Sequence, residues 1–374
     1  MLPYGRQSVT AEDIAAVTEV LQGDWLTTGP AVRTFEEQLG AWAGGTECVT
    51  VTSGTAALHT AYAACRVGHG DEVVTTPMTF VATASCASIL GATPVFADID
   101  LATGLLDPEA AKAATSSRTR AVTAVDYAGQ PADYDALRQV TDACGALLIA
   151  DAAHSIGSRY RGRAVGSVAD VTTFSFFPTK NLTTAEGGAV ATPHADIATR
   201  ARRFRTIGLV RDHGDLRYPD EGGWHQEVHE FGVNYRLPDV LCALGLAQLN
   251  RLAAFRSRRL ALVERYRELL AGVDGIQLLE QRADSEATWH LFPVRVLDGR
   301  RREVYEKMRA AGIGVQVNYV PVYWHPVYAD LGYRRGLCPN AEQFYAEELS
   351  LPLFPDLTQA DQDRTVEALV AALG

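Results

Sequence analysis

The stretch LLIADAAH, residues 147–154, joins an apolar run to a carboxylate and an imidazole. A short apolar run of this kind is typical of a buried strand, so we expect a strand over 146–150 that ends beside Asp151. In open α/β sheets, ligands bind beyond the carboxyl ends of the strands, which is where Asp151 and His154 then stand. Asp151 therefore either binds a ligand at this edge or caps a helix that follows.

Short apolar runs alternate with helical patterns on both sides of this stretch. Such alternation predicts an α/β fold with a mainly parallel sheet, covered by helices on both faces. A capped helix over 10–21 and a helix over 32–42 precede the alternation. We expect the further strands over 48–51, 72–75, 121–125, 170–176 and 188–192, and helices over 55–65, 80–90, 134–144 and 195–207.

The last third of the chain predicts a smaller α+β domain. A strongly helical pattern over 238–270, broken only at Gly245, links it to the large domain, so we divide the chain into residues 1–245 and 246–374. We expect strands over 290–296 and 314–319, and helices over 303–311, 341–349 and 358–373.

Composition excludes several classes of protein. The 45 acidic and 34 basic residues give a net charge of −11, which opposes binding to nucleic acid. The uncharged stretch 73–97 contains Pro77, Gly91 and Pro94, so it predicts strand, loop and buried helix and not a membrane span. The six cysteines form no Cys-x-x-Cys pair and the first residues lack an export-signal pattern, which favours a cytoplasmic protein with reduced thiols.

Lysine is scarce, which makes each one easy to assess. The chain has only three, Lys112, Lys180 and Lys307, and the first and last lie in polar helical stretches typical of solvated charges. Lys180 instead follows the apolar run 171–178 and precedes a turn with Gly187 and Gly188. Partial burial there favours a neutral amine that attacks carbonyl groups, whereas a structural lysine that reaches the surface is the alternative.

A third element is the turn TSGTAA, residues 52–57, which follows a predicted strand and opens a helix. Free backbone N–H groups, the helix dipole and two hydroxyls suit a single phosphate, although many such turns merely cap helices. Phe80 lies at the next junction between strand and helix, where it either stacks on a flat ring or belongs to the core.

Other kinds of site are not indicated. The Walker, dinucleotide-binding and serine-hydrolase glycine motifs are absent. His225 and His229 are spaced as in a zinc motif, but their glutamate does not follow the first histidine and glycines surround the segment. We therefore expect no metal ion.

The combination of phosphate turn, aromatic residue, strand-end Asp151 and later Lys180 follows the chain order of fold-type-I pyridoxal-phosphate enzymes of the aspartate aminotransferase type. Over nearly its whole length, the sequence resembles the DegT/DnrJ family of nucleotide-sugar aminotransferases. The matching pieces are PYGRQS at 3–8, DWLTTGP at 24–30, SGTAAL at 53–58, DAAHS at 151–155, SFFPTKN at 175–181, EGG at 186–188 and GVNYR at 232–236.

The resemblance implies a role for each matching residue. Lys180 is expected to hold pyridoxal phosphate as a Schiff base, and Asp151 to pair with its pyridine nitrogen. Gly54, Thr55 and Ser175 are expected to hold the phosphate, and Phe80 and His154 to cover the two faces of the cofactor ring. Asn234 is expected to reach the phosphate of the cofactor in the neighbouring subunit of a homodimer. The sugar pocket is expected to include Tyr4, Trp25, Leu26, Thr27, Asn318, Tyr319 and Tyr323, two of which, Asn318 and Tyr323, stand where relatives carry histidines.

The same resemblance implies amino-sugar biosynthesis by ping-pong transfer of an amino group from L-glutamate to a nucleotide-linked ketosugar. The opening and residues 125–131 are most similar to transaminases that aminate C4 of a UDP-linked 4-keto-6-deoxy-N-acetylhexosamine. Transamination at C3 of the sugar or on a ketocyclitol is the first alternative. A catalytically silent sensor that keeps the fold is the second.

Overall fold

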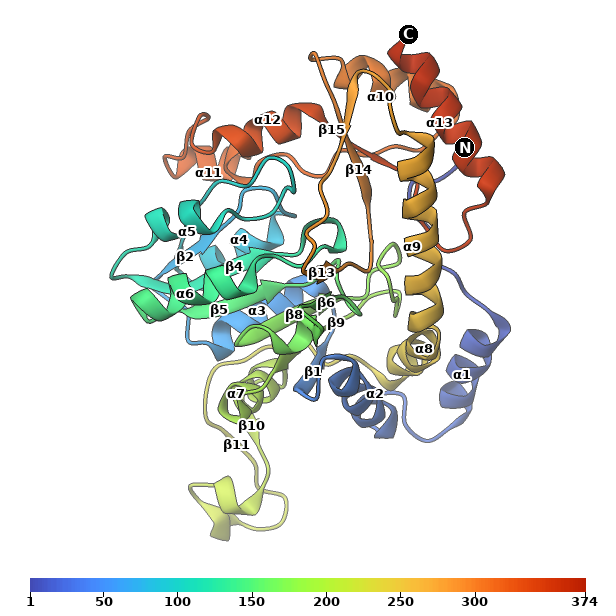
Figure 1. The fold of residues 1–374 in the computed structure, drawn as a ribbon. Helices are drawn as coiled ribbons and strands as arrows, with labels where there is room; N and C mark the ends of the chain where they lie inside the picture. Colours follow the sequence, from blue (N-terminus) through green and yellow to red (C-terminus); the bar gives the residue numbers. More distant parts are fainter.

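The computed structural model describes all residues 1–374, and its centre is a seven-stranded sheet with the strand order β1-β9-β8-β5-β4-β2-β3 (Figure 1). Strands β3, β2, β4, β5 and β8 pair in parallel, whereas β9 runs antiparallel to both β8 and β1. The mainly parallel sheet is therefore confirmed. Its strands are β1 Glu47–Val51, β2 Glu72–Thr75, β3 Thr93–Phe96, β4 Thr119–Val125, β5 Leu147–Asp151, β8 Val171–Ser175 and β9 Gly188–Thr192.

Helices cover both faces of this sheet, because successive strand residues point to opposite sides. Ile149 of β5 packs in one core cluster with residues of α3, α4 and α7. Its neighbours Leu148 and Ala150 pack in another with residues of α5 and α6. The covering helices are α3 Gly54–Ala64, α4 Ala82–Ile89, α5 Pro108–Ala114, α6 Tyr134–Cys144 and α7 Ala195–Arg205.

Two helices precede the sheet in the chain, and two more lead from it to the C-terminal part. They are α1 Ala11–Gln22, α2 Pro30–Trp42, α8 Asp239–Asn250 and α9 Leu252–Leu269. The break expected at Gly245 is wrong, since Gly245 lies inside α8 and the helices separate at Arg251. An ideal Cβ on Gly245 would lie 2.5 Å from the Phe35 ring, so this glycine serves packing and not a turn. The predicted domain boundary at 245 falls within α8, and the division into two domains stays a prediction.

The C-terminal part forms a three-stranded antiparallel sheet, β12-β14-β15, beside which α9 runs in Figure 1. The expected strand over 314–319 is wrong: Gln316 makes only a single bridge to Ser350, and the Asn318 N–H donates to the side chain of Glu348. The elements are β12 Ile276–Leu278, β14 Phe292–Val296, β15 Glu348–Leu351, α10 Arg301–Ala310, α11 Pro326–Asp330, α12 Pro339–Glu347 and α13 Gln359–Leu373.

Smaller elements complete the fold. Strands β6 Arg159–Tyr160, β7 Arg163–Ala164 and β13 Ser285–Glu286 form a small sheet, and β10 Leu209–Val210 pairs with β11 Glu227–Val228. We call residues 209–234 the arm, because Figure 1 shows them projecting below the central sheet. Short 3-10 helices occur at Tyr127–Gly129, Val165–Ser167, His213–Asp215, Pro219–Glu221 and Val322–Trp324. None of the helices is both long and apolar enough to traverse a bilayer.

Candidate active site

A cavity of about 490 Å³ lies where the carboxyl ends of β4, β5 and β8 meet the start of α3 and the extended segment 316–319. This is the edge at which open α/β sheets bind ligands, and the volume suits a small organic molecule. Ten of the residues expected from the sequence line it: Tyr4, Gly54, Thr55, Phe80, Asp151, His154, Ser175, Lys180, Asn318 and Tyr319.

Lys180 reaches the cavity from the loop after β8. Its backbone N–H donates to the Phe177 carbonyl at 2.9 Å, which closes the turn that carries it. Burial lowers the pKa of the Lys180 amine to about 8, and the nearby Asp151 carboxylate opposes this shift. A substantial fraction of the amine is therefore neutral near pH 8, as attack on a carbonyl group requires.

Asp151 stands at the end of β5 with its side chain buried. Its carboxylate accepts hydrogen bonds from Thr83 Oγ1 at 2.6 Å and from the Ala153 N–H at 3.2 Å. Burial raises the pKa of Asp151, while these two bonds and Lys180 hold it down. No α-helix begins after β5 until α7, and the 3-10 helix between them starts only at Val165, so Asp151 is not a helix cap and presents a supported negative charge to the cavity.

The turn before α3 has two functions. Ser53 caps the helix, since its Oγ accepts from the Ala56 N–H at 3.0 Å, while Gly54 and Thr55 face the cavity. An ideal Cβ on Gly54 would lie 2.7 Å from the Ser175 Cβ, so only glycine lets the helix terminus approach that strand. Backbone N–H groups and hydroxyls thereby gather at a helix N-terminus, where a phosphate binds well.

Aromatic rings border the cavity next to this turn. Phe80 is 59% exposed and so does not belong to the core, whereas His154 is buried. His154 Nε2 and the Tyr319 hydroxyl share a hydrogen bond of 3.2 Å, but the buried His154 Nδ1 has no partner. Burial, assisted by Lys180, puts the pKa of His154 well below its usual value, so the ring is neutral.

These features fit pyridoxal phosphate. The cavity offers an amine for the aldehyde, a buried carboxylate for the ring nitrogen, a helix terminus for one phosphate and flat side chains for the ring. The buried His154 Nδ1 that lacks a partner is placed where a polar ligand is needed. Gly54 brings the N-terminus of α3 against Ser175, so that both can contact one phosphate.

Five expected site residues do not line the cavity. Trp25 and Leu26 are more than half exposed on the loop that also carries Thr27. Asn234 lies at the base of the arm, where its backbone bridges to Thr206. Tyr323 is buried in the core, and its hydroxyl is engaged by Glu342 at 2.6 Å and by the Cys338 N–H at 3.1 Å.

The structure adds residues that sequence reasoning missed. Thr83 lies one helical turn after Phe80, a spacing that could have shown that both face the same side. His290 and Gln316 come from the C-terminal part, and no local pattern signals them. The rings of His154 and His290 have centroids 4.4 Å apart, so these two neutral imidazoles form one wall.

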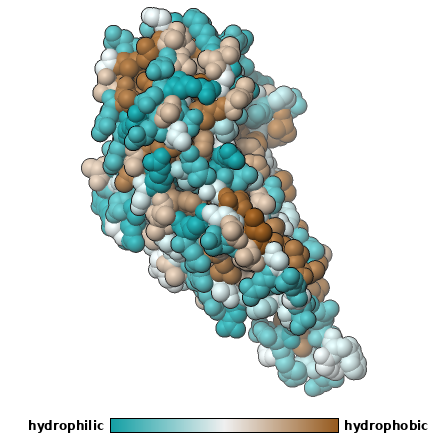
Figure 2. Space-filling view, turned by 90° about the vertical axis from the view of Figure 1, so that its right-hand side faces the viewer, coloured by the Kyte–Doolittle hydropathy of each residue, from teal (hydrophilic) through white to brown (hydrophobic).

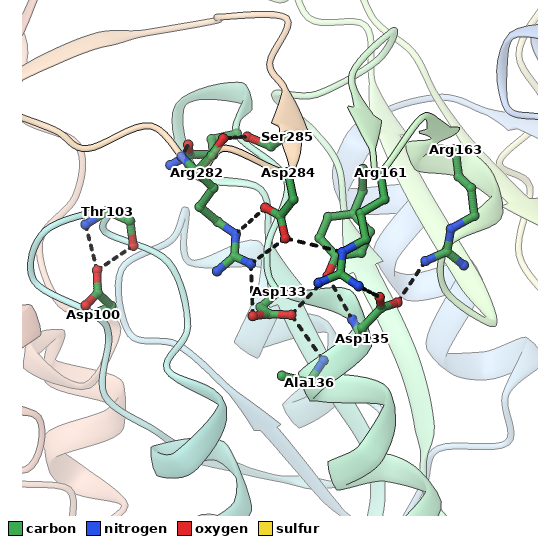
Figure 3. A network of polar contacts seen from close by, with 12 residues as sticks. Asp100, Thr103, Asp133, Asp135, Ala136, Arg161, Arg163, Arg282, Asp284 and Ser285 are labelled. Atoms are coloured by element: carbon green, nitrogen blue, oxygen red, sulfur yellow. Dashed lines mark hydrogen bonds and ion pairs between the residues drawn. The ribbon is translucent and has the colours of Figure 1, made fainter.

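A network of charged side chains, drawn in Figure 3, fixes the segment that leads to His290. Arg282 Nη2 lies 2.9 Å from Asp133 and 2.9 Å from Asp284, and Asp133 also caps α6. Arg161 joins it by contacts to Asp135 at 2.7 Å and Asp284 at 3.5 Å. The network anchors residues 282–286 to the start of α6 and to the turn between β6 and β7.

Hydrogen bonds continue this anchor up to the cavity. Asn181 Nδ2 donates to the carbonyls of His154 at 2.9 Å and Thr288 at 2.7 Å, and the Thr288 N–H donates to Ser158 Oγ at 2.8 Å. We call residues 282–290 the clamped segment. It holds His290 against His154.

The two histidines of the arm that are spaced as in a zinc motif bind a carboxylate instead. His225 and His229 both face the carboxylate of Glu227, at 3.2 and 2.5 Å. No group of three or more potential ligands in the structure is arranged to hold a metal ion.

Comparison with known proteins gives a consistent result. The model of the DegT/DnrJ/EryC1/StrS aminotransferase family matches residues 7–370. The spore coat polysaccharide biosynthesis protein SpsC of Bacillus subtilis is 38% identical to the chain, over 98% of this chain and 96% of its own.

Solved structures agree with the family model. The putative sugar aminotransferase Spr1654 of Streptococcus pneumoniae in its PMP form superimposes with a TM-score of 0.93 at 30% identity, over 100% of this chain and 99% of its own. Helicobacter pylori PseC, an aminotransferase involved in pseudoaminic acid biosynthesis, gives 0.92 at 29% identity, over 99% and 98%. The chain therefore belongs to the DegT/DnrJ/EryC1/StrS aminotransferase family, and it is a pyridoxal-phosphate-dependent sugar aminotransferase of fold type I.

Proposed function

We propose that the enzyme transfers the amino group of L-glutamate to C4 of a UDP-linked 4-keto-6-deoxy-N-acetylhexosamine, as UDP-4-amino-4,6-dideoxy-N-acetyl-β-L-altrosamine transaminases do. The observation that carries the reaction is the meeting of Lys180 and Asp151 in one cavity beside a phosphate turn. The likeness to PseC and the opening of the chain support the choice of sugar.

Different residues of the chain have different roles in this reaction. Gly54, Thr55 and Ser175 bind the phosphate, and Asp151 keeps a negative charge at the ring nitrogen. Bound pyridoxal phosphate supplies an electron sink for the bond that breaks at the donor's α-carbon. Lys180 Nζ takes the proton from that carbon and, in the second half-reaction, delivers a proton to C4 of the sugar.

The remaining wall residues are assigned to the substrate. Neutral His154 covers a ring face without repelling the positive charge that Asp151 stabilises. Tyr4, Asn318 and Tyr319 line the cavity beside His154 and bring hydroxyl and amide groups to it, which suits a sugar. The assignment of Trp25, Leu26 and Thr27 to the sugar pocket stays a prediction, because none of them lines this cavity.

A panel of keto substrates tests this function. The pyridoxamine-phosphate form is titrated with UDP-linked 4-ketosugars, 3-ketosugars and ketocyclitols, and return of the pyridoxal-phosphate absorption reports turnover. We expect turnover with the 4-ketosugar and incorporation of the amine at C4, located by NMR. Turnover only of a ketocyclitol or a 3-ketosugar would replace the proposed substrate, and no reaction of the holoenzyme with glutamate would favour the sensor.

We also propose a homodimer in which Asn234 of one subunit reaches the phosphate held by the other. The arm supports this, because Trp224 is 84% and Phe231 98% exposed on it. Figure 2 shows the arm as the narrow lower end of the surface, with hydrophobic side chains gathered on the face above it. Exposed apolar groups of this extent are typical of interaction surfaces.

Mixed subunits provide the test of shared sites. Lys180→Ala and Asn234→Ala proteins are each expected to be nearly inactive. Random exchange between them makes about half of the dimers hybrids, and each hybrid has one intact site and one defective site. We therefore expect about a quarter of the wild-type activity to return. Activity is measured after joint refolding, with Lys180→Ala mixed with itself as the control, and no recovery on mixing would contradict shared sites.

A cytoplasmic location remains part of the proposal. Six free cysteines, five of them buried, support it, because they require no oxidising compartment.

A further inference from the structure

A buried carboxyl lies directly behind one wall of the cavity. Glu348, the first residue of β15, is fully buried and takes part in none of the ion pairs of the structure. Its oxygens accept from the Asn318 N–H at 2.6 Å and from Ser350 Oγ at 2.6 Å. The preceding Glu347 differs, because it pairs with Arg295 at 2.6 Å.

The contacts of Glu348 converge on the wall assigned to the sugar. Asn318 is held on three sides, since its Nδ2 donates to Ser350 Oγ at 3.0 Å and its carbonyl accepts from the Tyr127 hydroxyl at 2.7 Å. Tyr319 follows it and shares its hydroxyl with His154. Removing the bond from Glu348 therefore loosens the backbone that carries two lining residues.

The surroundings of Glu348 favour its uncharged form. Burial is the main cause that raises the pKa of Glu348 to about 8. Tyr4, Tyr127 and Tyr319 lie near it, from the N-terminus, the 3-10 helix at 127–129 and the segment 316–319; burial is the main cause that raises the pKa of each, and the charge of Glu348 adds to the rise. Arg301 of α10 is the cation that acts against this, together with the bonds from Ser350 and Asn318.

We propose that Glu348 is a positioning residue of the sugar pocket, whose carboxyl holds the Asn318–Tyr319 wall through the Asn318 N–H and holds it more firmly when it is ionised. The unpaired, fully buried carboxyl and its bond to the backbone of a lining residue carry this inference. Its effect on the sugar rests on the proposed function, whereas the protonation state of Glu348 does not.

The test compares Glu348→Gln, which imitates the uncharged acid, with the wild type. In the pyridoxamine-phosphate form, the wild-type Kd for the 4-ketosugar is expected to fall with rising pH relative to that of Glu348→Gln, because the ionised carboxyl is the stronger acceptor for the Asn318 N–H. For a group that titrates near pH 8, the ratio of the two Kd values falls by up to about tenfold from pH 7 to pH 9. Using the ratio removes the titration of Lys180, which both proteins share.

Glu347→Gln is the matched control, because it removes the neighbouring carboxyl that faces Arg295. Its Kd should follow the wild type at every pH. Should Glu348→Gln fail to fold, Ser350→Ala removes one bond that favours the ionised acid, so the alkaline fall in Kd should move to higher pH. A constant ratio, or an unmoved fall in Ser350→Ala, would overturn the proposal.

A measurement without substrate tests the role of Glu348 independently of the proposed function. Infrared difference spectra of the holoenzyme between pH 7 and pH 9.5 should show the loss of a protonated carboxyl band in the wild type and not in Glu348→Gln. If the panel identifies another keto acceptor, the Kd ratio is measured with that acceptor. The same infrared loss in both proteins would show that another acid titrates, and would reject the role of Glu348.

Discussion

Replacing Lys180 with alanine is expected to reduce transamination about 10⁴-fold or more, the largest effect of any single change in this chain. The side chain is assigned both the covalent attachment of the cofactor and the proton transfers, and no other lysine lines the cavity. The donor half-reaction, followed by visible absorption after adding glutamate, measures the loss. Borohydride reduction of the wild-type holoenzyme should place the cofactor mass on the peptide that contains Lys180.

Lys307→Ala provides the control for this experiment. Lys307 pairs with Glu303 on the exposed side of α10, so its loss should leave the half-reaction unchanged. A Lys180→Ala protein that keeps activity within tenfold of the wild type would refute the assignment. So would reduction that labels Lys112 or Lys307 instead.

Changing Asp151 to asparagine is expected to slow the donor half-reaction about 10²–10³-fold. The amide oxygen can still accept from Thr83, so the fold is kept while the charge beside the ring nitrogen is lost. The pKa of Lys180 should also fall further, because the Asp151 carboxylate now holds it up. Single-turnover absorption measurements with glutamate across pH 6 to 9 report both effects.

Asp135→Asn is the matched control for Asp151→Asn. Asp135 belongs to the charged network of Figure 3, where it binds Arg161 and Arg163 away from the cavity. Its rate should stay near that of the wild type. An Asp151→Asn enzyme within threefold of the wild type would show that the ring nitrogen needs no carboxylate partner.

The local pattern of apolar residues predicted the helices and strands that bury a regular face. The strand that ends at Asp151 was predicted correctly because its residues are uniformly apolar and a carboxylate stops the run. Lys180 was found through its contrast with two solvated lysines. The alternation of strands and helices gave the parallel sheet, although the reversed direction of β9 depends on pairing between distant segments.

Several elements were missed, and only some of them lack a local signal. Strand β3 contains Pro94, which breaks the usual strand pattern, and its paired partner β2 supplies the bonds. The short helix α5 was announced by Asp107 and Pro108, a cap signal that was overlooked. Strand β15 follows α12 without a glycine or proline between them, so the expected helix over 341–349 ran into it.

The wall of the site was predicted only in part, for a similar reason. His290 comes from a segment whose position depends on Asn181 and Arg282, contacts that link residues more than a hundred positions apart. Tyr323 was assigned to the pocket by likeness, but its hydroxyl is engaged by Glu342. The positions of these side chains depend on tertiary contacts, which produce no periodic pattern in the sequence.

The clamped segment has a consequence for the kinetics of ligand exchange. Widening the cavity on the His290 side requires breaking the bonds of Asn181 and the ion pairs of Arg282 together, which makes that route slow. Phe80 lines another part of the cavity and is already largely exposed. We therefore expect substrate to enter and product to leave past Phe80, so that residence times respond first to changes there.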